Sequence, residues 1–189
     1  ETLRGAQILR YHAGEAQQPV GEHYPSANPT TMLYTLHEPL GVVGVITPWN
    51  FPIAIPAWKM APALAFGNTV VFKPASATPL CAVHIVAALE EAGVPKGVVN
   101  LVTGPAGEVG DPIVQDDRVV AISFTGSVDV GAGIRKIASA RGAKIQLELG
   151  GKNPAIVLAD ADLDHAVGQV LNGAMMSSGQ KCTATSRAI

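Results

Sequence analysis

Residues 41–73 read GVVGVITPWNFPIAIPAWKMAPALAFGNTVVFK, and this stretch decides the fold. It begins with an apolar run at 41–47 and ends with a mostly apolar run at 69–73, separated by enough chain for a helix. Such runs are typical of strands in a buried parallel sheet, where neighbouring strands need a long connection between them. The stretch therefore predicts a strand, a crossover helix and a second strand.

The same stretch also bears on membrane insertion. Residues 41–58 carry no charged side chain, and a helix of that length could cross a bilayer. However, Pro48, Pro52 and Pro56 lie inside it, and each proline removes a backbone donor and interrupts a helix. We therefore expect a buried strand, a turn and a helix, and no membrane partner.

Beyond residue 73, strand-like and helix-like segments continue to alternate toward the C-terminus. A helix at 80–92 is expected to stop at Gly93, and Ser127 can cap a second helix. Either Asp160 or Asp162 can cap a third. The remaining strands are expected at 98–102, 119–124, 144–149 and 154–158. The repetition predicts a doubly wound, Rossmann-like α/β fold.

Two segments do not fit that sheet. Residues 1–18 have the pattern of a weakly amphipathic helix. Residues 19–38 are polar, contain proline turns and end in alternating apolar side chains, so we interpret them as a protruding β-hairpin arm. A lone hairpin has too few neighbours to bury its apolar face. Pairing of the arm with another subunit is one hypothesis, and a surface loop is an equal alternative.

Composition narrows the class of protein. The chain has 189 residues, with 13 basic and 15 acidic side chains and a net charge of −2, so no electrostatic signature for nucleic acid is present. Its two cysteines cannot form a disulfide framework, and we expect a cytoplasmic setting. The five histidines show no metal-ligand spacing, so no metal site is expected. Because the chain begins with Glu1, we expect it to start inside a longer polypeptide.

Cys182 is the most informative residue for chemistry. An isolated cysteine is usually a small buried hydrophobe, and Cys81, at a helix start among apolar neighbours, has that character. Cys182 instead follows an amphipathic helix, in the loop sequence GQKCT. Loops at the ends of regular elements often present reactive groups, and the adjacent Lys181 would favour a thiolate if it points the same way. Cys182 is therefore the candidate nucleophile.

Glu148 is the candidate general base. It stands between Leu147 and Leu149 at the end of an apolar strand, where burial of a carboxylate is costly unless it is partnered or functional. The alternative is an alternating edge strand with Glu148 facing water. The glycines that follow, Gly150 and Gly151, favour the functional interpretation because they permit a sharp turn and close approach of a ligand.

Asn50 lies in the sequence PWNFP, directly after the first strand. Its side-chain amide is suited to donate a hydrogen bond to an oxyanion. An asparagine at a strand–helix junction is equally suited to cap the helix before Pro52. Both roles stay open from the residues alone.

Two further loops are candidates for nucleotide contacts. Residues 73–76, KPAS, follow a strand, and ligands of open α/β sheets bind beyond the carboxyl ends of strands. Gly126 and Ser127 end another strand and open a helix, whose N-terminus can hold a phosphate. The glycine-rich stretch 104–110 matches neither a dinucleotide fingerprint nor a phosphate-binding loop.

In combination and order, the motifs PWNFP, KPAS, FTGS, ELGGKNP and GQKC resemble the aldehyde dehydrogenase superfamily of NAD(P)-dependent enzymes. The resemblance runs through essentially the whole chain but covers only part of a family member. It implies an NAD(P)-binding domain at 1–18 and 39–149, an oligomerisation arm at 19–38 and the N-terminal part of a catalytic domain at 150–189. It also implies a homodimer or homotetramer.

The resemblance further implies the roles of individual residues. Cys182 would attack the aldehyde to give a thiohemiacetal, whose oxyanion Asn50 and the Cys182 backbone N–H would hold. Hydride transfer to the nicotinamide would leave a thioester, and Glu148 would activate the water that hydrolyses it. Lys73 is placed with these catalytic residues. The implied cofactor contacts are Trp49, Asn50, Lys73, Pro74, Ala75, Ser76, Gly126, Ser127 and Leu149.

Cofactor and substrate preferences follow from finer details of the resemblance. NAD-preferring relatives commonly carry glutamate where Ser76 stands, and serine removes its repulsion of a 2′-phosphate, so NADP is expected to be accepted, with NAD as the other cofactor. The sequences GQKCTATSR and KPASATP are similar to those of semialdehyde dehydrogenases. Two alternatives remain: a non-catalytic dinucleotide-binding or assembly module, and a cysteine-dependent acyl hydrolase.

Overall fold

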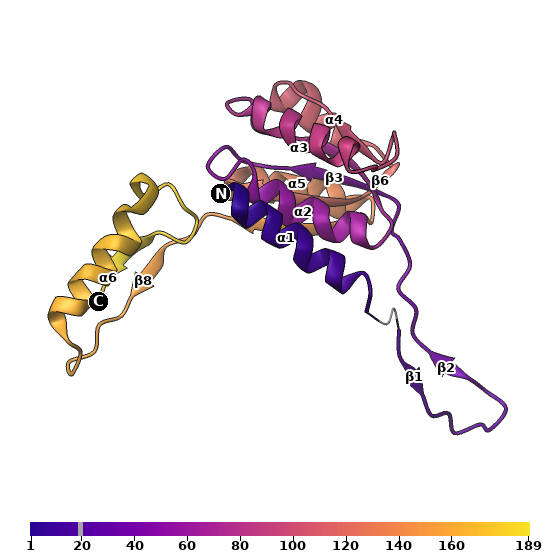
Figure 1. Cartoon of the computed structure of the whole chain (residues 1–189), viewed down its shortest axis with the longest axis horizontal. Coiled ribbons are helices and arrows are strands. Elements are labelled where there is room, and N and C mark those ends of the chain that lie inside the picture. The colour runs from indigo at the N-terminus through magenta and orange to yellow at the C-terminus, as the bar shows by residue number, and fades with distance from the viewer. Residues whose placement is uncertain (19–20) are drawn as a thin grey trace.

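The structure, a computed structural model, describes residues 1–18 and 21–189. It contains a central parallel sheet covered by helices, a thin arm, and a smaller C-terminal unit that stands to one side of the sheet (Figure 1). The predicted α/β class is confirmed, and so is the parallel arrangement of the sheet.

The central sheet has five strands in the order β5-β4-β3-β6-β7. Their bounds are β3 (Val42–Ile46), β4 (Thr69–Lys73), β5 (Val99–Leu101), β6 (Val119–Gly126) and β7 (Lys144–Leu149). From β3 the chain proceeds outward through β4 to β5, then returns to β6 on the other side of β3. The strand order therefore reverses between β3 and β6, which is where open α/β sheets bind ligands.

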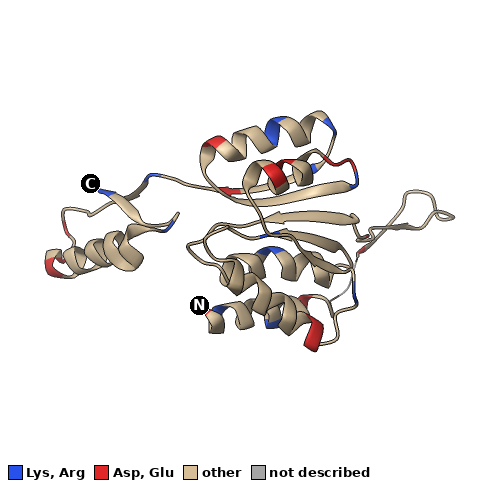
Figure 2. Cartoon of the chain, turned by 90° about the horizontal axis from the view of Figure 1, so that it is seen from above, with Lys and Arg blue, Asp and Glu red and all other residues tan. Residues whose placement is uncertain are grey.

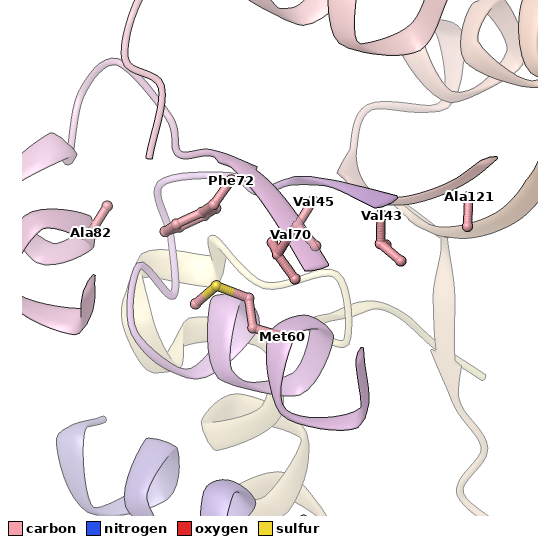
Figure 3. Packing of buried hydrophobic residues seen from close by; sticks show 7 residues of the cluster. All are labelled: Val43, Val45, Met60, Val70, Phe72, Ala82 and Ala121. Atoms are coloured by element: carbon pink, nitrogen blue, oxygen red, sulfur yellow. The ribbon is translucent and has the colours of Figure 1, made fainter. Parts of the chain in front are cut away.

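Helices cover both faces of this sheet. On one face lie α2 (Ala54–Ala65) and α3 (Pro79–Glu91), and on the other lie α4 (Asp111–Gln115) and α5 (Val128–Ala140). Figure 3 shows the first face, where Val45 and Phe72 from neighbouring strands approach Met60 of α2. In β3 and β4, alternate apolar residues point to opposite faces of the sheet, and each face packs against helices. The continuous apolar runs in the sequence predicted this burial on both faces.

The N-terminal helix α1 (Thr2–Glu15) lies against α2. Ile8 of α1 is buried with the small side chains of α2, and Glu1 also contacts the start of that helix. Glu1 Oε1 accepts hydrogen bonds from the backbone N–H groups of Ile53 and Ala54, each at 2.9 Å. Glu1 thus caps α2, and the alternative in which Asn50 is the cap is wrong.

The arm is an extended hairpin, as the sequence predicts. Its strands β1 (His23–Tyr24) and β2 (Leu33–Tyr34) pair antiparallel, and all four residues are exposed. In Figure 1 it projects away from the sheet at the end remote from the C-terminal unit. The predicted arm began at residue 19, and residues 19–20 lie outside the described part of the chain.

The C-terminal unit is a separate α/β element. It contains β8 (Asn153–Ala155), α6 (Leu163–Met175), a short helical turn η2 (Met176–Gly179) and β9 (Thr185–Ala188), with β8 and β9 paired in parallel. The strand expected at 154–158 therefore starts one residue earlier, is shorter, and belongs to this second sheet. Asp162, the second of the two cap candidates, accepts a hydrogen bond from the His165 N–H at 3.1 Å. The apolar stripe of α6 is exposed.

The stretch after β5 differs from the sequence prediction. A glycine-rich loop was expected at 104–110, but a π-helical turn, η1 (Ala106–Gly110), runs directly into α4. Among the described residues, no helix is long and apolar enough to cross a membrane. Figure 2 shows basic and acidic residues interspersed over both units rather than gathered by sign.

Candidate active site

The predicted site residues follow the carboxyl ends of four strands of the central sheet. Trp49 and Asn50 follow β3, Lys73 is the last residue of β4 and 74–76 follow it, Gly126 ends β6 and Ser127 precedes α5, and Glu148 is the last residue but one of β7. Parallel strands place their carboxyl ends at one edge of the sheet, so motifs that are far apart in sequence share this edge. The edge includes the point between β3 and β6 where the strand order reverses.

The loop that carries Cys182 reaches this edge from the C-terminal unit. Asn50 Nδ2 donates a hydrogen bond to the backbone oxygen of Gln180 at 2.9 Å, which ties the loop to the turn after β3. Cys182 is exposed, and it lines the same cavity as Glu148, with a volume of about 790 Å³. The structure therefore places Cys182 and Glu148 on one cavity and bonds Asn50 to the loop that carries Cys182.

Glu148 is exposed rather than buried, so the expected cost of burying it does not apply. The reason is that β7 is an edge strand whose side chains alternate between exposed and half-buried. Ile145, Leu147 and Leu149 pack toward α5, whereas Gln146 and Glu148 face the cavity. Gln146 Nε2 donates a hydrogen bond to Glu148 Oε1 at 3.0 Å, so the carboxylate is held by its neighbour two positions earlier.

Lys59 is a polar site residue that the sequence reasoning missed. It lies on α2 with 6% of its surface exposed, and its ammonium donates to Gln146 Oε1 at 2.8 Å and to Ser123 Oγ at 3.0 Å. Burial lowers the pKa of Lys59 from 10.5 to about 8, while the nearby charge of Glu148 opposes the shift. The feature of the sequence that could have identified Lys59 is its charge within the otherwise apolar helix AIPAWKMAPALA.

Lys73 and Ser76 lie at a second position on the same edge. Lys73 is 5% exposed, burial lowers the pKa of its ammonium, and Nζ donates to the Pro74 backbone oxygen at 3.1 Å. The Ser76 hydroxyl donates to the Gly104 backbone oxygen at 3.2 Å and so links the loops after β4 and β5. Ala75 O accepts from the Thr78 N–H at 3.1 Å. Neither Lys73 nor Ser76 lines the cavity that contains Cys182.

The helix that follows β6 begins at this edge. Ser127 Oγ accepts a hydrogen bond from the Val130 N–H at 3.4 Å, so the predicted cap of α5 is confirmed. Gly131, one turn later, lies so close to Leu149 that an added Cβ would be 2.5 Å from Leu149 Cδ2. Trp49, which follows β3, is 48% exposed.

The edge has unused polar groups that fit a dinucleotide. Thr47 Oγ1 and Asn50 Oδ1 are buried without a hydrogen-bond partner in the described chain. The N-terminus of α5 offers backbone donors to a phosphate, and the Lys73 ammonium adds a positive charge. In residues 1–18 and 21–189, no group of three or more His, Cys, Asp or Glu side chains is arranged to hold a metal ion.

Comparison with known proteins identifies the family. Residues 1–189 match the aldehyde dehydrogenase family along their whole length. The chain belongs to the aldehyde dehydrogenase family. The resemblance drawn from the five motifs is therefore confirmed.

Curated relatives and solved structures of this family are closely similar. The chain is 58% identical over 189 residues to alpha-ketoglutaric semialdehyde dehydrogenase of Bacillus subtilis, covering all of this chain and 39% of that protein. It is 51% identical over 191 residues to 2,5-dioxopentanoate dehydrogenase of Saccharolobus solfataricus, covering all of this chain and 40% of that protein. The crystal structure of Staphylococcus aureus betaine aldehyde dehydrogenase with NAD+ has a TM-score of 0.94 and 44% identity, covering 97% of this chain and 36% of that chain. The chain thus spans about two fifths of the length of the curated relatives it matches.

Proposed function

We propose that this protein oxidises an aldehyde to a carboxylic acid with a nicotinamide dinucleotide as oxidant, and that Cys182 is the nucleophile. The observation that carries the proposal is that Cys182 and Glu148 line one cavity while Asn50 is bonded to the loop that carries Cys182. Family membership supports the reaction class. It does not favour a non-catalytic module.

The first step is attack of the Cys182 thiolate on the aldehyde carbon. The C–S bond forms as the carbonyl π electrons move onto oxygen, which becomes an oxyanion. The amide nitrogen of Asn50 carries two protons, and only one is used in the bond to Gln180. The second is available to the oxyanion, together with the Cys182 backbone N–H. Loss of one such donor typically slows a reaction by about 100- to 1000-fold.

The residues that would hold the dinucleotide are those at the sheet edge. The ammonium of Lys73, which is bonded to the Pro74 backbone oxygen, would donate to oxygens of the dinucleotide, and the N-terminus of α5 after Ser127 would supply backbone N–H groups to its diphosphate. When bound, the nicotinamide supplies the two-electron oxidant that converts the thiohemiacetal on Cys182 into a thioester. The remaining contacts are assigned to Trp49, Asn50, Pro74, Ala75, Ser76, Gly126 and Leu149.

The last step is hydrolysis of the thioester. Glu148 takes a proton from water as the water oxygen attacks the carbonyl carbon, and the C–S bond breaks to release the acid and the Cys182 thiolate. Gln146 orients Glu148 by its hydrogen bond, and Lys59 holds Gln146 from the opposite side. This arrangement gives the exposed carboxylate a fixed position in the cavity.

The substrate we propose is a semialdehyde, a small aldehyde that also carries a carboxylate. The sequences around Cys182 and Ser76 support this class, and so do the names of the relatives from Bacillus subtilis and Saccharolobus solfataricus. We also propose that NADP is accepted as well as NAD, because serine at position 76 places no negative charge beside a 2′-phosphate.

The domain assignment stays a proposal. Residues 1–18 and 39–149 would form the NAD(P)-binding domain, 150–189 the start of the catalytic domain, and 19–38 the arm of a cytoplasmic homodimer or homotetramer. Exposed Tyr24, Leu33 and Tyr34 support the role of the arm, because apolar side chains on a two-stranded hairpin gain burial only from a partner. A monomer in sizing experiments would overturn the arm assignment.

The proposed function is tested with the longest natural polypeptide that contains these residues. NADP and NAD reduction is measured across a panel of semialdehydes for the wild type, Cys182→Ser and the matched control Cys81→Ser. We expect the wild type and the control to oxidise at least one semialdehyde, and Cys182→Ser to be inactive. Oxidation that persists in Cys182→Ser would exclude the assigned nucleophile, and aldehyde-independent thioester hydrolysis without cofactor reduction would favour the hydrolase.

A further inference from the structure

Three successive backbone oxygens around the proposed nucleophile each accept a hydrogen bond from a different group. Gln180 O accepts from Asn50 Nδ2 at 2.9 Å, Lys181 O accepts from the Ala184 N–H at 3.2 Å, and Cys182 O accepts from Asn153 Nδ2 at 2.5 Å. Three consecutive peptide planes are therefore oriented. Since φ and ψ of a residue relate the planes on either side of it, the direction of the Cys182 side chain is set by these contacts.

Asn153 makes the contact that lies on the C-terminal side of the thiol. Its Nδ2 group also donates to the Ala184 backbone oxygen at 3.3 Å, so one amide spans the loop across Thr183. Its own backbone oxygen accepts from Ser186 Oγ at 3.4 Å. Both protons of the side-chain amide are used within the loop that carries Cys182.

The backbone of Asn153 is fixed independently of that loop. Asn153 begins β8 and is the register partner of Thr185, where β9 begins. Its side chain is half-buried, unlike those of Lys152 and Pro154 on either side. The short segment 148–153 carries Glu148, the proposed general base, at one end and Asn153 at the other. Because Asn153 bonds the Cys182 backbone, this segment connects the general base with the loop of the nucleophile.

We propose that Asn153 is a positioning residue that holds the Cys182 backbone so that the thiol is aligned with both the substrate and Glu148. This inference rests on the proposed function of Cys182 as nucleophile. Asn153 touches no reacting atom, and it acts through the carbonyl groups of residues 182 and 184. Loss of its amide frees the peptide plane that follows the nucleophile.

The variants Asn153→Ala and Asn153→Asp both remove the amide donor, and Asp keeps the shape of the side chain. In the longest natural polypeptide we expect kcat to fall about 10- to 100-fold with little change in KM, because a nucleophile displaced by about 1 Å loses that much rate. Alkylation of Cys182 by iodoacetamide in Asn153→Ala should stay within about threefold of wild type, because it depends on thiolate fraction and exposure rather than alignment. A merely structural defect would not separate these two rates.

A matched control is Asn100→Ala. Asn100 Nδ2 also donates to two backbone oxygens, Gly97 O at 2.8 Å and Val70 O at 3.4 Å, but it lies on β5, away from the thiol loop. We expect Asn100→Ala to keep wild-type kcat. If it loses kcat as the Asn153 variants do, the effect is general loss of structure and the proposal is overturned. If both Asn153 variants keep wild-type kcat, it is overturned as well.

Amide hydrogen exchange supplies a measurement that does not depend on activity. In Asn153→Ala, which removes the donor without placing a charge against the carbonyl oxygens of residues 182 and 184, exchange in residues 180–184 is expected to accelerate while exchange in β3 and β6 stays unchanged. Unchanged exchange in residues 180–184 would overturn the proposal that Asn153 holds the Cys182 backbone. If Cys182→Ser keeps its activity, the proposed function fails. The hydrogen-exchange result still tests whether the Asn153 amide holds the backbone of residues 180–184.

Discussion

Lys59 Nζ lies 2.8 Å from Gln146 Oε1, and the amide nitrogen of the same glutamine donates to Glu148 Oε1 at 3.0 Å. One glutamine side chain therefore connects a buried ammonium on α2 with the carboxylate at the end of β7. Burial lowers the pKa of Lys59 to about 8, and Glu148 is the charge that opposes this shift. Lysine at this position is consequently a group whose protonation changes close to neutral pH.

The first prediction concerns stability at alkaline pH. Between about pH 8 and pH 10.5 the folded protein holds Lys59 neutral while the unfolded chain keeps it protonated. The unfolded state then binds one more proton, so the Lys59 contribution to the free energy of unfolding rises with pH across this window, by at most about 3 kcal/mol. Urea denaturation at several pH values should show this rise in the wild type and its loss in Lys59→Met.

Lys136→Met is the matched control, because Lys136 is an exposed lysine on α5. It should keep the wild-type pH dependence. Parallel stability curves for the wild type and Lys59→Met between pH 8 and pH 10.5 would contradict the prediction.

Much of the sheet was predictable from local sequence. The apolar runs predicted β3 and β4 to within one residue, because strands covered by helices on both faces have little room for polar side chains, whereas the sequence KIQLEL predicted β7 as a strand of alternating polar and apolar residues. The exposure of Glu148 was one of two alternatives that the sequence left open. It depends on β7 having a neighbour on one side only, which is a property of strand order rather than of the sequence KIQLEL.

The same distinction applies to the site residues: some could be assigned from local sequence, and others depend on contacts between distant segments. Motifs after strands β3, β4 and β6 could be assigned to one sheet edge, because parallel strands bring their carboxyl ends together. Lys59 and Asn153 could not be assigned roles, since these depend on which oxygens from distant segments come within hydrogen-bond distance. The helix α4 was missed because it is only five residues long and directly follows Gly107 and Gly110, which locally favour a loop.

The second prediction concerns cofactor choice at Ser76. Its hydroxyl donates to the Gly104 backbone oxygen, and because serine is neutral the KPAS loop carries no negative charge at this position. Ser76→Glu should repel a 2′-phosphate and lower kcat/KM for NADP at least about tenfold relative to NAD, which corresponds to about 1.4 kcal/mol. The measurement is kcat/KM for both cofactors in the longest natural polypeptide.

Ser76→Gln separates charge from size in that experiment. Glutamine has the shape of glutamate without its charge, so the ratio of NADP to NAD efficiency should remain close to that of the wild type. An equal loss of NADP use in Ser76→Gln and Ser76→Glu would show that bulk, not charge, determines the effect. A wild-type preference for NAD of more than about a hundredfold, equivalent to about 2.7 kcal/mol, would also refute NADP acceptance.

The third prediction concerns the cap that α1 provides to α2. Glu1 Oε1 accepts hydrogen bonds from the N–H groups of Ile53, directly before α2, and Ala54, its first residue, and its negative charge lies at the positive end of the helix. Glu1→Ala should lower the free energy of unfolding by about 1 kcal/mol, as for other lost helix caps. Urea denaturation checks this, with Glu91→Ala, an exposed glutamate at the end of α3, as the control. Equal stability of Glu1→Ala and Glu91→Ala would contradict the capping role.

The fourth prediction compares two glycines on α5. Gly131 is buried toward β7, and an added Cβ would lie 2.5 Å from Leu149 Cδ2, so Gly131→Ala forces Leu149 to move. We expect Gly131→Ala to be destabilised by about 1–3 kcal/mol, as for other overpacked cores, and to raise KM for the dinucleotide because Leu149 is an assigned contact. Gly133 has no atom within 4 Å of its added Cβ, and Gly133→Ala should stabilise the protein by about 0.5–1 kcal/mol through reduced chain entropy. Urea denaturation and cofactor titration of both variants test this, and a Gly131→Ala variant as stable as Gly133→Ala would show that α5 does not pack against Leu149 as described.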